Sequence, residues 1–62
     1  MQNKKLLYTK KVHGSLIRLI LFNGHFLVNL FHSSGHFSSH RFASLSQAYS
    51  FIAFLTNKLK KS

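Results

Sequence analysis

The dipeptide Asn23-Gly24 divides the longest apolar stretch of this sequence into two runs, SLIRLILF at 15–22 and HFLVNLFH at 25–32. Asn and Gly most easily adopt the positive φ angles that both central positions of a type I′ turn require, and such turns join antiparallel strands. A membrane span is not expected, because it needs about 20 apolar residues and a central Arg costs about 2.5–3.5 kcal/mol on insertion scales. Arg18 lies inside the first run. The sequence therefore predicts a β-hairpin.

Both faces of the predicted hairpin are largely apolar. Side chains alternate between the faces of a strand, so one face carries residues of even number in the first run and of odd number in the second: Leu16, Arg18, Ile20, Phe22, His25, Leu27 and Asn29. The opposite face is rich in Ile17, Leu19 and Leu21. Alternation alone does not decide which face lies inside. Because one helix covers one face only, we expect a protein partner, a second copy of the chain in a homodimer, or a bound ligand to cover the other.

Two further strands are predicted on either side of the hairpin. Residues 4–12 (KKLLYTKKV) alternate, and the face that contains Val12 is predicted to carry Leu6, Tyr8 and Lys10. The turn His13-Gly14-Ser15 follows this strand. After a second turn at residues 33–35 (SSG), residues 36–42 (HFSSHRF) have the polar character of an edge strand.

Residues from about 45 to 60 have the period of an amphipathic helix. The apolar stripe consists of Leu45, Ala48, Ile52, Leu55 and Leu59, widened by Phe51. Ser44 is a suitable N-cap with Gln47 three residues later, as in a capping box. The predicted fold class is α+β, a small antiparallel three- to four-stranded sheet (β-meander) with one C-terminal helix packed on one face. Residues 1–62 are expected to form a single small basic domain, frayed at 1–3 and 61–62.

The stretch HRFASLSQAYSFIAFL at 40–55 ends a predicted strand at Phe42 and begins a capped helix. In element order and periodicity it is similar in general pattern to DNA-binding domains that combine a three-stranded sheet with a helix, such as the arm-binding domains of integrases. The Trp and Arg positions that are diagnostic of those domains are absent or have no counterpart in this chain. The resemblance is therefore one of topology, and it implies the order of elements alone.

The charge of the chain restricts its partners. Its 62 residues include nine Lys or Arg and no Asp or Glu, whereas an average domain of this length carries about seven acidic residues. Repulsion among the cations opposes folding, and a polyanion relieves it. The sequence therefore predicts a nucleic-acid-binding protein that contacts the phosphate backbone, with RNA slightly favoured over DNA and a ribonucleoprotein as one possible setting.

The predicted nucleic-acid contacts are basic residues and two histidines. They are Lys4, Lys5, Lys10, Lys11, Arg18, His36, His40, Arg41, Lys58, Lys60 and Lys61. Interleaved aromatic residues provide surfaces on which bases stack, and these are Tyr8, Phe37, Phe42 and Tyr49. Most of the seven Phe are nevertheless expected in the core. For four to six neutralised phosphates, log K is predicted to fall with log salt with a slope of about −4 to −5.

Missing residue types argue against other functions. Without Asp, Glu or Cys, no side-chain carboxylate or thiol is available for acid–base or nucleophilic catalysis, so no enzymatic activity is expected. His32, His36 and His40 have the spacing of metal ligands on a helix, but a turn interrupts them and no other ligand type completes a site, so no metal or cofactor is expected. The absence of Cys is consistent with the cytoplasm or an equivalent reducing compartment that contains nucleic acid.

The alternative hypothesis is a small protein-interaction module or inhibitor, of the type found in phages and mobile elements. Such a protein would dock on a host protein or complex that handles nucleic acid. The two apolar faces of the predicted hairpin support this interpretation, because a protein partner could cover the second one.

Overall fold

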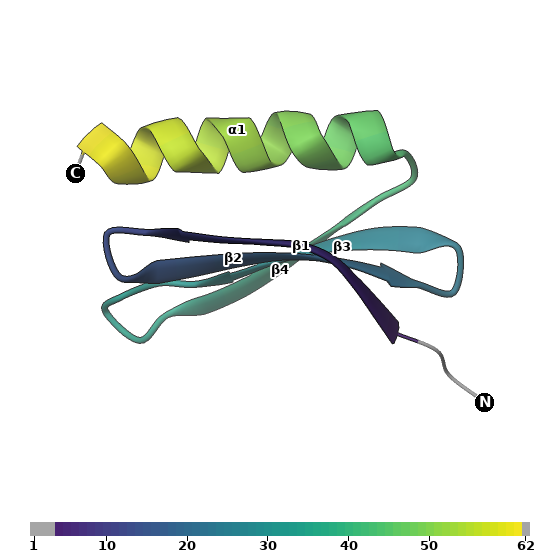
Figure 1. Ribbon diagram of the computed structural model, residues 1–62, viewed down its shortest axis with the longest axis horizontal. Coiled ribbons are helices and arrows are strands. Elements are labelled where there is room, and N and C mark those ends of the chain that lie inside the picture. Colours follow the sequence, from purple (N-terminus) through teal and green to yellow (C-terminus); the bar gives the residue numbers. More distant parts are fainter. Residues whose placement is uncertain (1–3, 62) are drawn as a thin grey trace.

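A computed structural model describes residues 4–61 as a four-stranded antiparallel sheet with one helix against it. The strands are β1 (Lys4–Val12), β2 (Ser15–Phe22), β3 (His25–Phe31) and β4 (Phe37–Phe42), and the helix is α1 (Leu45–Lys61). The sheet has the order β1-β2-β3-β4, and α1 lies across one of its faces (Figure 1). The predicted α+β meander with a C-terminal helix is confirmed. Of the ends predicted to fray, residues 1–3 and 62 lie outside the described residues, and Lys61 is the last residue of α1.

Two-residue turns close the first two hairpins. Asn23 and Gly24 have φ angles of 52° and 75°, and His13 and Gly14 have 48° and 82°. Positive φ at both central residues defines a type I′ turn, whose twist matches that of the flanking strands. The turn predicted at Asn23-Gly24 is therefore confirmed, and it sets Phe22 directly opposite His25.

The connection from β3 to β4 is longer and is held by hydrogen bonds. The N–H of Gly35 donates to the carbonyl of His32 at 2.9 Å, and the N–H of His32 donates to the carbonyl of His36 at 2.7 Å. The N–H of Ser33 donates to the buried hydroxyl of Ser15 at 3.0 Å. This last bond ties the connection to the first residue of β2.

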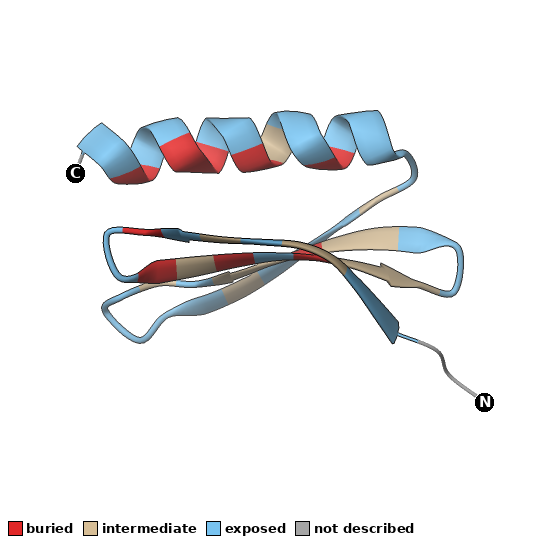
Figure 2. Ribbon diagram, viewed as in Figure 1, coloured by how far each residue is buried: buried red, intermediate tan, exposed pale blue. Residues whose placement is uncertain are grey.

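The core lies between the sheet and α1. Ile17 and Leu19 of β2 and Val28 of β3 have 0% exposure, and the buried residues of α1 are on its sheet-facing side (Figure 2). The helix contributes apolar side chains at Ala48, Ile52, Leu55 and Leu59. The inner face of the central hairpin is therefore the one that carries Ile17 and Leu19, and the face that carries Leu16, Arg18 and Ile20 points away from α1.

A β-bulge changes the predicted alternation of β1. Leu6 pairs with Ile20 while Tyr8 pairs with Leu19, so two steps along β1 match one step along β2. The extra residue is Leu7, which packs against the core. Leu6 consequently lies on the face opposite to that of Tyr8, and the prediction that both share one face is wrong. A bulge inserts one unpaired residue and reverses the faces beyond it.

The helix begins and packs nearly as predicted. The N–H of Gln47 donates to the hydroxyl of Ser44 at 3.2 Å, which confirms the N-cap. Leu45 is exposed, although the apolar stripe was predicted to include it. Thr56 is buried instead, and its hydroxyl donates to the carbonyl of Ile52 at 2.8 Å. That bond satisfies a polar group within an otherwise apolar contact.

The phenylalanines lie around the core and not in it. None of the seven is fully buried. Phe26, Phe42 and Phe51 are partly buried and pack against the margin of the core. Phe31, Phe37 and Phe54 are exposed. The expectation that most Phe fill the core is wrong. The strand phenylalanines are all at or next to a strand end, whereas the centre is filled by Ile, Leu and Val from the middle of β2 and β3.

Candidate nucleic-acid interface

The open face of the sheet is the face opposite to α1. Residues paired across antiparallel strands share a face, so the register gives its composition as four rows. They are Lys4–Phe22–His25, Leu6–Ile20–Leu27–Arg41, Thr9–Arg18–Asn29–Ser39 and Lys11–Leu16–Phe31–Phe37. In the described part of the chain, α1 is the only element outside the sheet, and it lies on the other side (Figure 1). The open face thus combines cations, polar groups and apolar side chains.

Four cationic side chains belong to this face, one near its centre and three towards its edges. Arg18 is near its centre, Arg41 is at the β4 edge, and Lys4 and Lys11 are at the two ends of β1. All four are exposed. Two of them lie over rings of the same face: the guanidinium carbon of Arg18 is 5.6 Å from the ring centre of Phe31, and the Lys4 Nζ is 5.4 Å from that of Phe22. A ring face attracts a cation, so these charges are positioned above apolar surface.

Phe31 and Phe37 form an aromatic pair at one end of the open face. They are directly opposite each other on β3 and β4, and their ring centroids are 4.8 Å apart. Their exposed fractions are 40% and 57%. Isolated apolar side chains on a surface are ordinary, but contiguous exposed patches mark interaction sites. This aromatic pair adjoins Leu16 in the same row, so apolar side chains are contiguous at this end of the open face.

A polar row crosses the centre of the open face. The hydroxyl of Ser39 donates to Asn29 Oδ1 at 2.7 Å. Arg18 pairs with Asn29 in the register. An Asn amide nitrogen and an Arg guanidinium are both donors, so this row can meet acceptors such as phosphate oxygens and base carbonyls.

The structure brings together four of the eleven predicted contact residues on the open face, namely Lys4, Lys11, Arg18 and Arg41. The other seven lie elsewhere. Lys5, Lys10 and His40 pair with residues of the helix side of the sheet, which are Leu21, Ile17 and Val28. His36 precedes β4, and Lys58, Lys60 and Lys61 lie in the last turn of α1. The basic residues therefore do not form one continuous surface.

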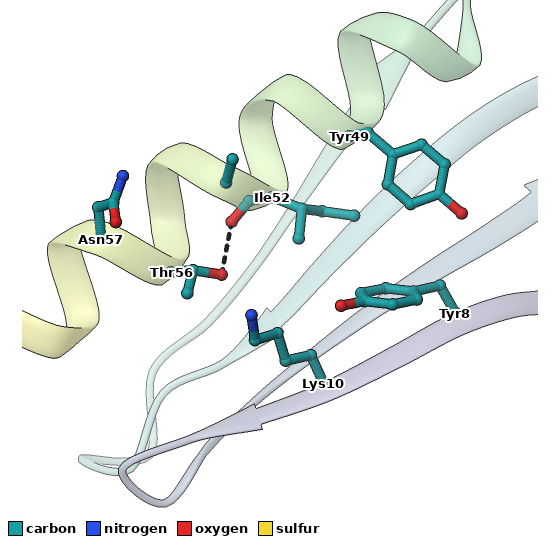
Figure 3. A pocket seen from close by; sticks show the side chains of 7 residues that line it. Tyr8, Lys10, Tyr49, Ile52, Thr56 and Asn57 are labelled. Carbon is teal, nitrogen blue, oxygen red and sulfur yellow. Dashed lines mark hydrogen bonds between the residues drawn. The ribbon is translucent and has the colours of Figure 1, made fainter.

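A groove between β1 and α1 is a second feature of the structure (Figure 3). Its volume is about 290 Å³, and it is lined by Tyr8, Lys10, Tyr49, Ile52, Ala53, Thr56 and Asn57. The rings of Tyr8 and Tyr49 meet edge-on with centroids 5.7 Å apart. Figure 3 shows Lys10 rising from β1 toward α1. The lining includes one cation, so the groove offers a phosphate far less positive charge than the open face.

The histidines make contacts that differ from those of a metal site. His32 Nδ1 is 2.9 Å from the hydroxyl oxygen of Ser34, and the His40 ring centre is 4.6 Å from that of Phe51. Within residues 4–61, no three of the side chains that commonly bind metals lie together as a metal site requires.

The sequence places Phe31 on a face of its strand but does not identify Phe37 as its neighbour on β4. Its odd number places it with His25, Leu27 and Asn29, so its face follows from alternation. Its partner Phe37 follows a five-residue connection, and such a connection does not fix the register in the way that a two-residue turn does.

Comparisons with protein-family models, with curated proteins and with solved structures found no match for this chain. The helix of the described segment does not reach the length and hydropathy that crossing a bilayer requires.

Proposed function

We propose that this protein binds nucleic acid without catalysing a reaction, and that the open face is the interface. The supporting observation is that Arg18, Arg41, Lys4 and Lys11 share one face with exposed apolar side chains, in a chain without acidic residues. Cations of this kind neutralise phosphates and release counterions. A chain without Asp, Glu or Cys also has few groups for catalysis. RNA is the preferred ligand class, and a ribonucleoprotein is the preferred setting.

A second copy of the chain is a poor occupant of the open face. Pairing two open faces would bring four cations from each copy together, and neither copy has an acidic side chain to separate them. Pairing two β1 edges would align lysines in the same way, because Lys4, Lys5, Lys10 and Lys11 all belong to that strand. Like charges placed together cost several kcal/mol. A polyanion, in contrast, would be attracted by the same cations.

The proposal is tested with two double variants that remove equal charge. Arg18→Ala with Arg41→Ala acts on the open face, and Lys60→Ala with Lys61→Ala acts on the end of α1. Binding of a labelled 20-nucleotide RNA is measured by fluorescence anisotropy between 50 and 300 mM KCl. The arginine variant is expected to lose affinity and to reduce the salt slope by about 1.4, since each single-strand phosphate contact contributes about 0.7. The lysine variant is expected to change both much less.

Equal effects of the two variants would mean that total charge matters and the open face does not. Absence of binding to both RNA and DNA by the unaltered protein at 50 mM KCl would contradict the proposal altogether. All four substituted residues are exposed, and surface changes usually alter stability by no more than about 0.5 kcal/mol, so each variant is expected to keep the fold. Circular dichroism checks this.

A protein-interaction module is the second candidate, favoured by the aliphatic row of the open face. Leu6 is 56% exposed, and it continues across the sheet into Ile20 and Leu27. A protein partner could bury this row, with its acidic groups near Arg41. Purification from cells after nuclease treatment distinguishes the two functions. A stoichiometric partner that persists through nuclease and is lost with Leu6→Ser supports this candidate, whereas nucleic acid that leaves with salt supports the first.

A further inference from the structure

We infer that the open face takes a single strand, whose unpaired bases stack on the aromatic pair Phe31–Phe37 while its phosphates contact Arg18, Arg41, Lys4 and Lys11. This inference rests on the proposed function and narrows it to one class of nucleic acid. Three features of the open face support it: the exposure of the two rings, the positions of the cations and the width of the sheet.

The width of the sheet disfavours the major groove of a duplex. Four strands with adjacent spacings of about 4.8 Å place the outer strands about 14 Å apart before side chains are added, and the groove of B-DNA is about 12 Å wide. The whole open face therefore does not enter the groove. A flexible single strand has no such restriction, and it can follow the face from one row to the next.

The chemistry of the aromatic pair also favours unpaired bases. Inside a duplex, base faces are covered by their neighbours, and only base edges are accessible in the grooves. Exposed rings stack on bases that are free of a duplex. Phe31 and Phe37 are both exposed, and Arg18 lies over the Phe31 ring at 5.6 Å. A guanidinium this close to the aromatic pair can contact the phosphate of a nucleotide whose base stacks on the adjacent, more exposed ring of Phe37.

The arrangement spans more than one nucleotide. The row with Phe31 and Phe37 is at one end of the open face, and the row with Lys4 and Phe22 is at the other. Leu16 and Phe22 are six residues apart on β2, which corresponds to about 20 Å at a rise of about 3.4 Å per residue. Each end has one cation and at least one phenylalanine ring, and Arg18 lies between the ends, so the face is suited to a strand of several nucleotides.

The experiment compares one 12-nucleotide DNA of mixed sequence, alone and annealed to its complement, by fluorescence anisotropy at 50 mM KCl. Duplex DNA carries about twice the charge per unit length of a single strand, so attraction by charge alone would favour the duplex. We expect the single strand to bind more tightly. Phe37→Ala and Phe31→Ala are each expected to weaken binding of the single strand about tenfold, and Phe37→Trp is expected to retain it.

Two control variants make the test specific. Phe54→Ala removes a ring with 58% exposure from α1, which nearly matches the 57% of Phe37, and it is expected to leave affinity unchanged. Phe37→Leu keeps an apolar side chain without a ring and is expected to behave like Phe37→Ala. A duplex that binds as tightly as the single strand, or full affinity in Phe37→Leu, would overturn stacking while leaving nucleic-acid binding by the open face intact. If neither form of the DNA nor RNA binds, both proposals fail.

Discussion

Consecutive residues of β2 lie on opposite faces of the sheet, so some contribute to folding and others to the proposed binding surface. Ile17 and Leu19 have 0% exposure and contribute to the core, while Arg18 between them is exposed on the open face. The period of two along a strand produces this separation. A substitution at Arg18 can therefore change binding with little effect on folding, and a substitution at either neighbour does the reverse.

Leu19→Ala is predicted to unfold much of the protein. Truncating a fully buried Leu typically costs about 2–5 kcal/mol, and a domain of about 60 residues has a stability of only about 3–9 kcal/mol at the usual value per residue. Leu6→Ala is the matched control, because it is the same substitution at a side chain with 56% exposure. Thermal unfolding followed by circular dichroism should show a large fall in Tm for the first variant and a small change for the second. Similar falls would mean that the core is placed incorrectly.

At the scale of elements, the turns and the helix were predictable because each has a local cause. Asn23-Gly24 supplies positive φ, and Ser44 supplies a capping oxygen, so neighbouring residues decide the outcome. The bulge of β1 was not predictable in this way. Leu6, Leu7 and Tyr8 are all compatible with either face, and packing against α1 selects Leu7 and Tyr8 for the core side. As a consequence of this packing, Leu6 lies on the open face.

The candidate site was predictable only in part for the same reason. The basic residues are evident from composition, but their separation onto two faces depends on the register and the bulge. Lys10 and Lys11 are adjacent in sequence, yet Lys10 lines the groove beside α1 and Lys11 lies on the open face. The pairing of Phe31 with Phe37 likewise depends on the geometry of the connection that joins β3 to β4.

The helix cap offers a test at the element scale. Ser44→Ala removes the hydroxyl that accepts the Gln47 N–H, and loss of such a cap costs about 1 kcal/mol. Ser46→Ala is the control, since Ser46 lies inside the first turn and is exposed, where Ala is the better helix former. Urea unfolding should place the Ser44 variant below the unaltered protein and the Ser46 variant at or above it. Equal midpoints for both variants would contradict the role of Ser44.

At the scale of the whole molecule, every interaction between charged side chains is repulsive. The chain contains nine Lys or Arg and no Asp or Glu, and its radius of gyration is 11.5 Å. At 10 mM salt the Debye length is about 30 Å, so the cations repel one another across the entire fold, and at 150 mM it is about 8 Å. The folded state therefore has more to gain from screening than the expanded unfolded chain does. The same imbalance supports an anionic partner over a second copy.

Added salt is accordingly predicted to stabilise the protein. Tm measured by circular dichroism should rise between 10 and 150 mM NaCl, because screening weakens repulsion that is strongest in the compact state. A single-stranded 12-nucleotide DNA added at 10 mM NaCl should raise Tm further than NaCl of equal ionic strength, since a ligand that binds only the folded state stabilises it by mass action. At 150 mM NaCl the increment from the DNA should shrink, because salt weakens the phosphate contacts. A Tm that falls with NaCl, or a DNA effect no larger than that of matched salt, would contradict the view that repulsion among cations limits stability and that a nucleic acid relieves it.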